Sequence, residues 1–67
     1  MKKLSVSLSG HQTSVSLEDE FVVALREIAT RRNVSVAALI AEIDDTRKIG
    51  DNLSSAIRVW VLNYFHK

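Results

Sequence analysis

Gln12-Thr13-Ser14-Val15-Ser16-Leu17 is the stretch that decides the fold, because polar and apolar side chains alternate along it. Alternation with a period of two is typical of a β-strand with one dry face and one wet face. The side chains expected to point inward are Thr13, Val15 and Leu17. The side chains expected to point outward are Gln12, Ser14 and Ser16. An isolated strand leaves its backbone amides unpaired and is unstable in water, so a second strand must lie beside it.

The size of the chain indicates where that second strand comes from. A chain of 67 residues buries only about 60% of the surface that it exposes when unfolded. Ordering it costs roughly 1.5 kcal/mol per residue, which a single small core barely offsets. The sequence contains no Cys, so neither disulfides nor thiolate metal sites can stabilise the fold. Association remains, and we therefore expect a homodimer in which the same strand of a second copy completes the ribbon.

The first ten residues contain a second copy of the strand pattern. Leu4-Ser5-Val6-Ser7-Leu8 is similar to Thr13-Ser14-Val15-Ser16-Leu17 at an offset of nine residues. One interpretation of residues 1–10 is an extra strand that folds back over a turn at Ser9-Gly10-His11, because Gly readily adopts a positive φ. The other interpretation is a mobile, basic N-terminal arm. The sequence alone leaves both interpretations open.

Residues 18–32 have the periodicity of an amphipathic helix. The apolar residues on one face of this helix are Phe21, Val22, Leu25, Ile28 and Ala29. Ser16 or its neighbour is expected to cap the start, where the acidic residues 18–20 complement the helix dipole. Asn33 is suited to the left-handed position that ends a helix. The segment is therefore predicted to be the first helix.

Two further helices follow. Ser35 is a candidate N-cap for a second helix over residues 35–46. The apolar positions of that helix are Val36, Leu39, Ile40 and Ile43. Gly50 breaks the pattern, and a third helix is predicted over residues 52–66. The apolar face of the third helix contains Leu53, Ala56, Ile57, Trp60, Val61, Tyr64 and Phe65. Because Val59 and Leu62 lie outside that face, this helix is more apolar than one core requires, which indicates a subunit interface.

The order of strand, helix, two-residue turn and helix over residues 12–43 resembles the ribbon-helix-helix DNA-binding family, which includes the methionine repressor and the Arc repressor. The resemblance rests on Leu17, which joins strand and helix directly, on the apolar spacing of the first helix, and on Asn33-Val34-Ser35 as the interhelical turn. It implies a mainly α fold with one strand and two helices. Residues 1–67 would form a single domain, with the third helix as the C-terminal extension of a subfamily.

The resemblance also implies a dimer that shares an intermolecular two-stranded antiparallel ribbon. The residues expected at the dimer interface are Thr13, Val15, Leu17, Leu39, Ile40, Ile57, Trp60 and Val61. Such a ribbon fits the major groove of DNA, where base edges differ in their donors, acceptors and methyl groups. The residues expected to contact bases are Gln12, Ser14 and Ser16. Gln12 suits bidentate contact with adenine, and the two serines can donate or accept.

The distribution of charge sets limits on this interpretation. The chain carries 9 Lys and Arg against 8 Asp and Glu, a net charge of +1, so no overall basic field attracts nucleic acid. Many members of the family carry Arg or Lys on the strand, whereas this sequence has neither between Lys3 and Arg26. The cations expected to contact phosphate instead are Lys2, Lys3, Arg31 and Arg32.

The start of the second helix is a further candidate for phosphate contact. In the family that the chain resembles, this helix N-terminus lies against a phosphate, and its free backbone N–H groups and positive dipole end explain why. The resemblance therefore implies phosphate contacts at Ser35 and Val36. An ordinary N-cap without DNA would equally explain Ser35.

Signals for catalysis, metal binding and membranes are weak. His11 and His66 are far apart and lack further ligands at metal spacing, and Asp44-Asp45 do not form a pair that would bind a metal or transfer protons. The sequence contains no phosphate-binding Gly-rich loop and no nucleophile motif. We therefore expect no enzyme, no cofactor and no metal site. We also expect a cytoplasmic protein, because neither a secretory signal nor a membrane span is recognisable.

Together these features predict a homodimeric regulator of transcription, of the repressor type, that binds specific sequences of double-stranded DNA. The alternative is a protein-interaction module, such as an antitoxin or adaptor, that binds a partner protein through the C-terminal helix or the N-terminal arm. An apolar surface in which Trp60, Val61 or Tyr64 were exposed together would favour that alternative.

Overall fold

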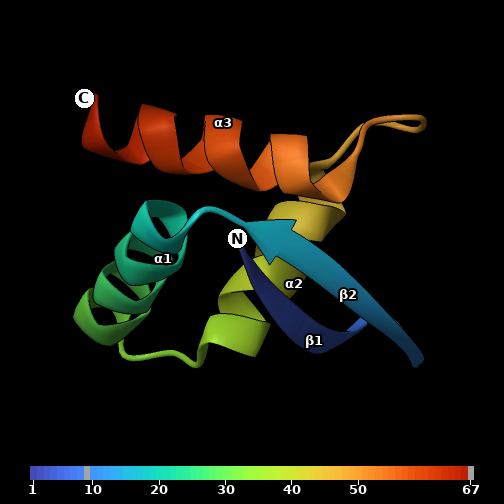
Figure 1. The fold of residues 1–67 in the computed structure, drawn as a ribbon, viewed down its shortest axis with the longest axis horizontal. Helices are drawn as coiled ribbons and strands as arrows, with labels where there is room; N and C mark the ends of the chain where they lie inside the picture. The colour runs from blue at the N-terminus through green and yellow to red at the C-terminus, as the bar shows by residue number, and fades with distance from the viewer. Residues whose placement is uncertain (9, 67) are drawn as a thin grey trace.

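The computed structural model describes residues 1–8 and 10–66 of the chain. A β-hairpin of β1 (Lys2–Leu8) and β2 (His11–Leu17) leads into the helices α1 (Asp19–Arg32), α2 (Val36–Thr46) and α3 (Leu53–Phe65). Figure 1 shows the hairpin beside α2, with α3 lying across α1 and α2 at the side remote from the turn that joins them. The order of strand and helices that the sequence predicts is therefore the order observed.

Residues 2–8 form a strand rather than an arm, and this strand is the partner of β2. β1 and β2 pair antiparallel, with Leu4 opposite Val15 and Ser5 opposite Ser14. A two-stranded antiparallel ribbon is thus present, but both of its strands come from one chain. β1 therefore pairs with β2 where we expected the strand of a second copy, and the homodimer stays a prediction.

The short connection between β1 and β2 explains why the chain pairs with itself. Gly10 has a φ of +81°, a conformation that Gly adopts without steric cost. Ser9, the first residue of the expected turn, lies outside the described residues. A connection this short closes the hairpin at a small entropic cost, so pairing within the chain is favoured over pairing between chains.

The helices begin and end within one residue of their predicted boundaries. Asn33 ends α1 in the left-handed conformation, with a φ of +57°. The start of α1 differs from expectation, because Glu18 occupies the N-cap position and makes no side-chain capping hydrogen bond. The Glu18 carboxylate instead accepts from Nε of Arg58 at 2.8 Å, which ties the start of α1 to α3.

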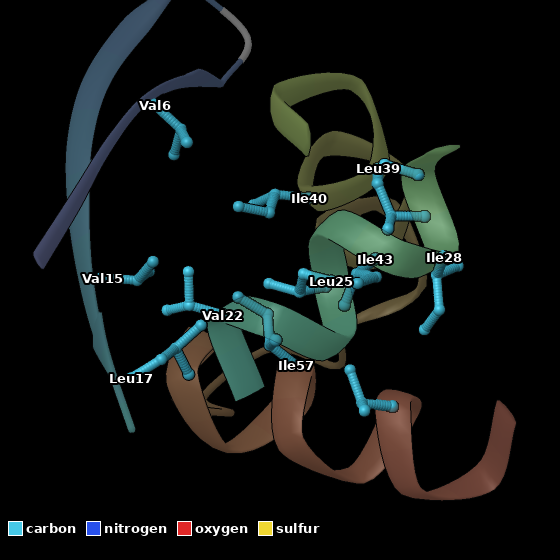
Figure 2. Packing of buried hydrophobic residues seen from close by; sticks show 12 residues of the cluster. Val6, Val15, Leu17, Val22, Leu25, Ile28, Leu39, Ile40, Ile43 and Ile57 are labelled. Atoms are coloured by element: carbon cyan, nitrogen blue, oxygen red, sulfur yellow. The ribbon is translucent and has the colours of Figure 1, made fainter. Parts of the chain in front are cut away.

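The hydrophobic core lies between the ribbon and the three helices, and it is closed within one chain. Its buried residues are Val6, Val15, Leu17, Val22, Leu25, Ile28, Ala29, Leu39, Ile40, Ile43, Ile57 and Val61. Figure 2 shows Val6, Val15 and Leu17 pointing from the hairpin toward the side chains of the helices. The expectation that helices this short cannot close a core within one chain is wrong, because β1 packs on α2 and supplies the missing cover.

Candidate nucleic-acid interface

The outer face of the ribbon carries the residues that we expected to contact DNA bases. Successive side chains of a strand point to opposite faces, and the buried residues Val6 and Val15 mark the inner face. The pairs on the outer face are Lys3 with Ser16, Ser5 with Ser14, and Ser7 with Gln12. All six side chains are exposed. The structure therefore brings the three predicted base-contacting residues together on one accessible face.

β1 contributes half of this outer face, including the cation that β2 lacks. Lys3 lies directly opposite Ser16 and shares the face with Gln12. The face therefore presents one ammonium, one amide and four hydroxyl groups. Neighbouring strands lie about 4.8 Å apart, so a ribbon of two strands fits into a major groove about 12 Å wide. Ser5 and Ser7 were not among the predicted base contacts, although the nine-residue repeat was the signal that contained them.

The two N-terminal lysines, both predicted to contact phosphate, lie on different faces of the ribbon. Lys2 pairs with Leu17, on the inner side and at the end of the strand, where it remains exposed. Lys3 is on the outer face. The two lysines therefore present their charges to opposite faces of the ribbon.

The start of α2 combines a satisfied cap with free backbone donors. The Ser35 hydroxyl accepts from the N–H of Ala38 at 3.0 Å, so the predicted N-cap is confirmed. The N–H groups of Val36 and Ala37 lie in the first turn, where a helix provides no acceptor for them. Because α2 also directs its positive dipole end here, this turn suits an anion.

A hollow of about 220 Å³ joins the start of α2 to the ribbon. It is lined by Leu4, Ser5 and Val6 of β1, Val22 and Arg26 of α1, and Val36 and Ala37 of α2. Arg26 is exposed and, among the described residues, forms no ion pair. Arg26 was not among the residues predicted from the sequence to contact DNA. Its position one turn after Val22 was the signal that it borders the core beside β1.

Arg31 and Arg32, the two phosphate contacts predicted on α1, are engaged with carboxylates. Arg31 pairs with Glu27 at 2.8 Å, and the guanidinium of Arg32 donates two hydrogen bonds to Glu42, one of them at 2.8 Å. The hydrogen bond from Arg32 lowers the pKa of Glu42, and the same contact raises the pKa of Arg32. Both arginines are exposed, but neither guanidinium is free in this conformation.

The residues predicted for a dimer interface form the core of a single chain. Six of the eight are at most 4% exposed: Val15, Leu17, Leu39, Ile40, Ile57 and Val61. The remaining two, Thr13 and Trp60, are half-buried. In this conformation the six buried residues have almost no surface that a second copy could cover.

The outward side of α3 bears on the alternative of a protein-interaction module. Trp60 stacks on Tyr64 with ring centroids 5.6 Å apart; both are half-buried, and Val61 is buried. The three residues are therefore not exposed together. The apolar residues that α3 does expose are Val59, Leu62 and Phe65, and nothing in the structure indicates a partner that covers them.

Within the part of the chain that the structure describes, no three side chains of His, Asp or Glu gather as metal ligands would. His11 and His66 are both exposed. Among residues 1–8 and 10–66, no helix is both long and apolar enough to cross a membrane.

Comparison with known proteins identifies the family to which the chain belongs. No curated protein and no solved structure is significantly similar to the chain. Residues 1–65 match the family described as "Ribbon-helix-helix domain", a match that includes β1 and α3 as well as the strand and helices recognised in the sequence. Domains of this family generally bind DNA and regulate transcription, mostly as dimers. On the strength of this match and of the observed order of ribbon and helices, the chain belongs to the ribbon-helix-helix domain family.

Proposed function

We propose that the chain binds specific sequences of double-stranded DNA and acts as a regulator of transcription, of the repressor type, in the cytoplasm. The outer face of the ribbon would enter the major groove. The observation that carries the proposal is the continuous exposed polar face formed by the three cross-strand pairs, which adjoins the free N–H groups at the start of α2.

Base contacts would come from β2 through the residues that the alternation places outward. Gln12 has an amide that can both donate and accept, which matches the N6 and N7 positions of adenine. Ser14 and Ser16 have short hydroxyl side chains, which allow the backbone to approach the base edges closely. These three residues would supply sequence preference, because contacts to phosphate carry no direct sequence information.

Phosphate contacts would come from groups at the border of the ribbon. The first turn of α2, at Ser35 and Val36, offers backbone donors, and Arg26 lies beside it in the same hollow. Lys2 lies at the end of β1. Arg31 and Arg32 would have to exchange their carboxylate partners for phosphate. Exposed ion pairs contribute little to stability because solvent screens them, so that exchange costs little.

We keep the homodimer, which is general for the family, but its interface must lie elsewhere than first expected. Six of the predicted interface residues are buried within one chain. Two copies bound to neighbouring half-sites would therefore meet through residues that remain exposed. Each copy would bring its own ribbon to the DNA.

Selection of bound sequences from random double-stranded DNA tests the proposal. We expect enrichment of one sequence motif, and affinity for it that falls as salt is added, since phosphate contacts release counterions. Fluorescence anisotropy at several salt concentrations gives the slope. A selection that enriches no motif, together with binding that salt leaves unchanged, would refute sequence-specific DNA binding.

A further inference from the structure

From the strand register we infer that one chain carries the complete base-reading ribbon, and that its two ends prefer different bases: guanine at Lys3 and adenine at Gln12. This inference rests on the proposed DNA binding. It assigns base contact to β1, which supplies Lys3, Ser5 and Ser7.

The repeat and the register together give the hairpin an approximate two-fold axis. Leu4–Leu8 repeats in residues 13–17 at an offset of nine, and the second residues of the two copies, Ser5 and Ser14, lie opposite each other. Rotation about that pair therefore exchanges β1 with β2. It superimposes Ser7 on Ser16 and Lys3 on Gln12. A single chain thus imitates a ribbon built from two identical strands.

The outer face departs from this symmetry at one position only. The four serines superimpose in pairs, whereas a lysine at one end corresponds to a glutamine at the other. A lysine ammonium only donates, so it matches the O6 and N7 acceptors of guanine. A glutamine amide both donates and accepts, so it matches adenine. The expected recognition sequence is nearly palindromic at its centre and asymmetric at its ends.

The surroundings of Lys3 allow this role. Its side chain is exposed and, among the described residues, forms no ion pair with a carboxylate. Lys2, its neighbour, faces the inner side of the ribbon opposite Leu17. The two lysines carry the same charge at adjacent positions, so they provide a matched pair in which only one should read bases.

A cysteine cross-link tests the origin of the ribbon without DNA. The chain has no Cys of its own. Directly opposed residues of an antiparallel pair have Cα atoms about 4.5–5.5 Å apart, within the range that a disulfide spans. The double variant Ser5→Cys/Ser14→Cys should therefore oxidise to a monomeric, intrachain disulfide on a non-reducing gel. Ser7→Cys/Gln12→Cys is a second pair that tests the same geometry if the first fails to fold.

The single variant Ser14→Cys is the control for the cross-link. If the ribbon were instead built from two copies of β2, Ser14 of one copy would lie directly opposite Ser14 of the other. The single variant should remain a free thiol at micromolar concentration. A disulfide-linked dimer of the single variant, or of the double variant, would overturn the one-chain ribbon.

Selection of DNA sequences with lysine variants tests the base preferences. Lys3→Gln should replace a guanine preference at one end of the site by adenine and make the selected motif symmetric. Loss of such a contact typically changes discrimination by roughly tenfold to hundredfold. Lys2→Gln removes the same charge and should weaken binding equally for all sequences, with no change of motif.

The outcomes separate this inference from the proposed function. If the natural chain selects no motif, DNA reading itself fails, while the cross-link still reports on the ribbon. If it selects a motif that Lys3→Gln and Lys2→Gln weaken alike, without a change of base preference, DNA binding stands and base reading by Lys3 is refuted.

Discussion

The two faces of the ribbon are built from the same two strands, and they serve opposite purposes. On the inner face, Val6, Val15 and Leu17 are at most 6% exposed and pack against the helices. On the outer face every side chain is polar and exposed, and none is needed to fill the core. Stability and recognition are therefore separated residue by residue along one strand, so neighbouring substitutions should have effects of different kinds.

The largest effect is expected on the inner face. Leu17→Ala removes a side chain that is 0% exposed, and such truncations cost about 2–5 kcal/mol because a cavity remains. That is a large part of the stability of a small domain. Urea unfolding followed by circular dichroism measures the loss. The neighbouring outer-face variant Ser16→Ala should change stability by less than about 0.5 kcal/mol, and equal losses for the two variants would contradict the separation of the faces.

A different kind of loss is expected on the outer face at Gln12. Gln12→Ala should leave the unfolding free energy unchanged and reduce affinity for the selected DNA by about 1–3 kcal/mol, the value of a bidentate base contact. Anisotropy titration on the selected site and on a site changed at one base measures both affinity and preference. Asn63→Ala, which removes an exposed amide from α3, is the matched control and should have no effect on binding. An unchanged affinity for Gln12→Ala would exclude Gln12 from the reading face.

Much of this arrangement could be predicted from the sequence, because it depends on local patterns. Alternation over residues 12–17 gave the two faces of β2, and the helical periodicities gave three helices with boundaries correct to one residue. Ser35 and Asn33 were recognised as helix ends because capping depends on a side chain and its immediate neighbours.

The role of β1 could not be predicted in the same way. Five alternating residues have the same appearance in a strand and in a solvated arm, and the difference lies in the packing of Val6 into the core. Without β1, the resemblance to the family placed Leu39 and Ile40 of α2 at an interface with a second copy. The contact between Glu18 and Arg58 joins residues 40 positions apart, and no local pattern indicates such a pair.

Ser35 extends the comparison, because one residue is expected to serve both stability and binding. Ser35→Ala removes the hydrogen bond to Ala38 and should cost about 1 kcal/mol of stability. Ser35→Asp keeps a capping oxygen and should preserve stability, while its negative charge beside a phosphate should weaken DNA binding. Parallel unfolding and anisotropy experiments distinguish the two effects. If Ser35→Asp binds DNA as tightly as the natural chain, no phosphate lies at this helix end.

The smallest effect is expected at Glu18, where the ribbon meets α1. The hydrogen bond from Arg58 is the main reason that the pKa of Glu18 is lowered. The pKa of Glu18 is lower in the folded state than in the unfolded state, so the ionised carboxylate stabilises the fold at neutral pH. That stabilisation is lost as the pH falls below about 4.3, the ordinary value for Glu. Glu18→Gln should therefore be slightly less stable than the natural chain at pH 7.

The difference between the Glu18→Gln variant and the natural chain should shrink as the pH falls below the ordinary pKa of Glu, which urea unfolding at several pH values measures. Glu20→Gln provides the control, since Glu20 is exposed in the same turn and, within the described residues, forms no ion pair. A difference for Glu18→Gln that does not shrink as the pH is lowered would show that the carboxylate does not stabilise the fold through its charge.

The short connection at Gly10 also determines the kinetic order of folding. A ribbon shared by two molecules can form only after they meet, so its rate depends on the concentration of the chain. A hairpin closed through one tight turn forms within about 1–10 μs by a unimolecular step. A single newly synthesised molecule can thus complete its ribbon at any copy number, without waiting for a second one.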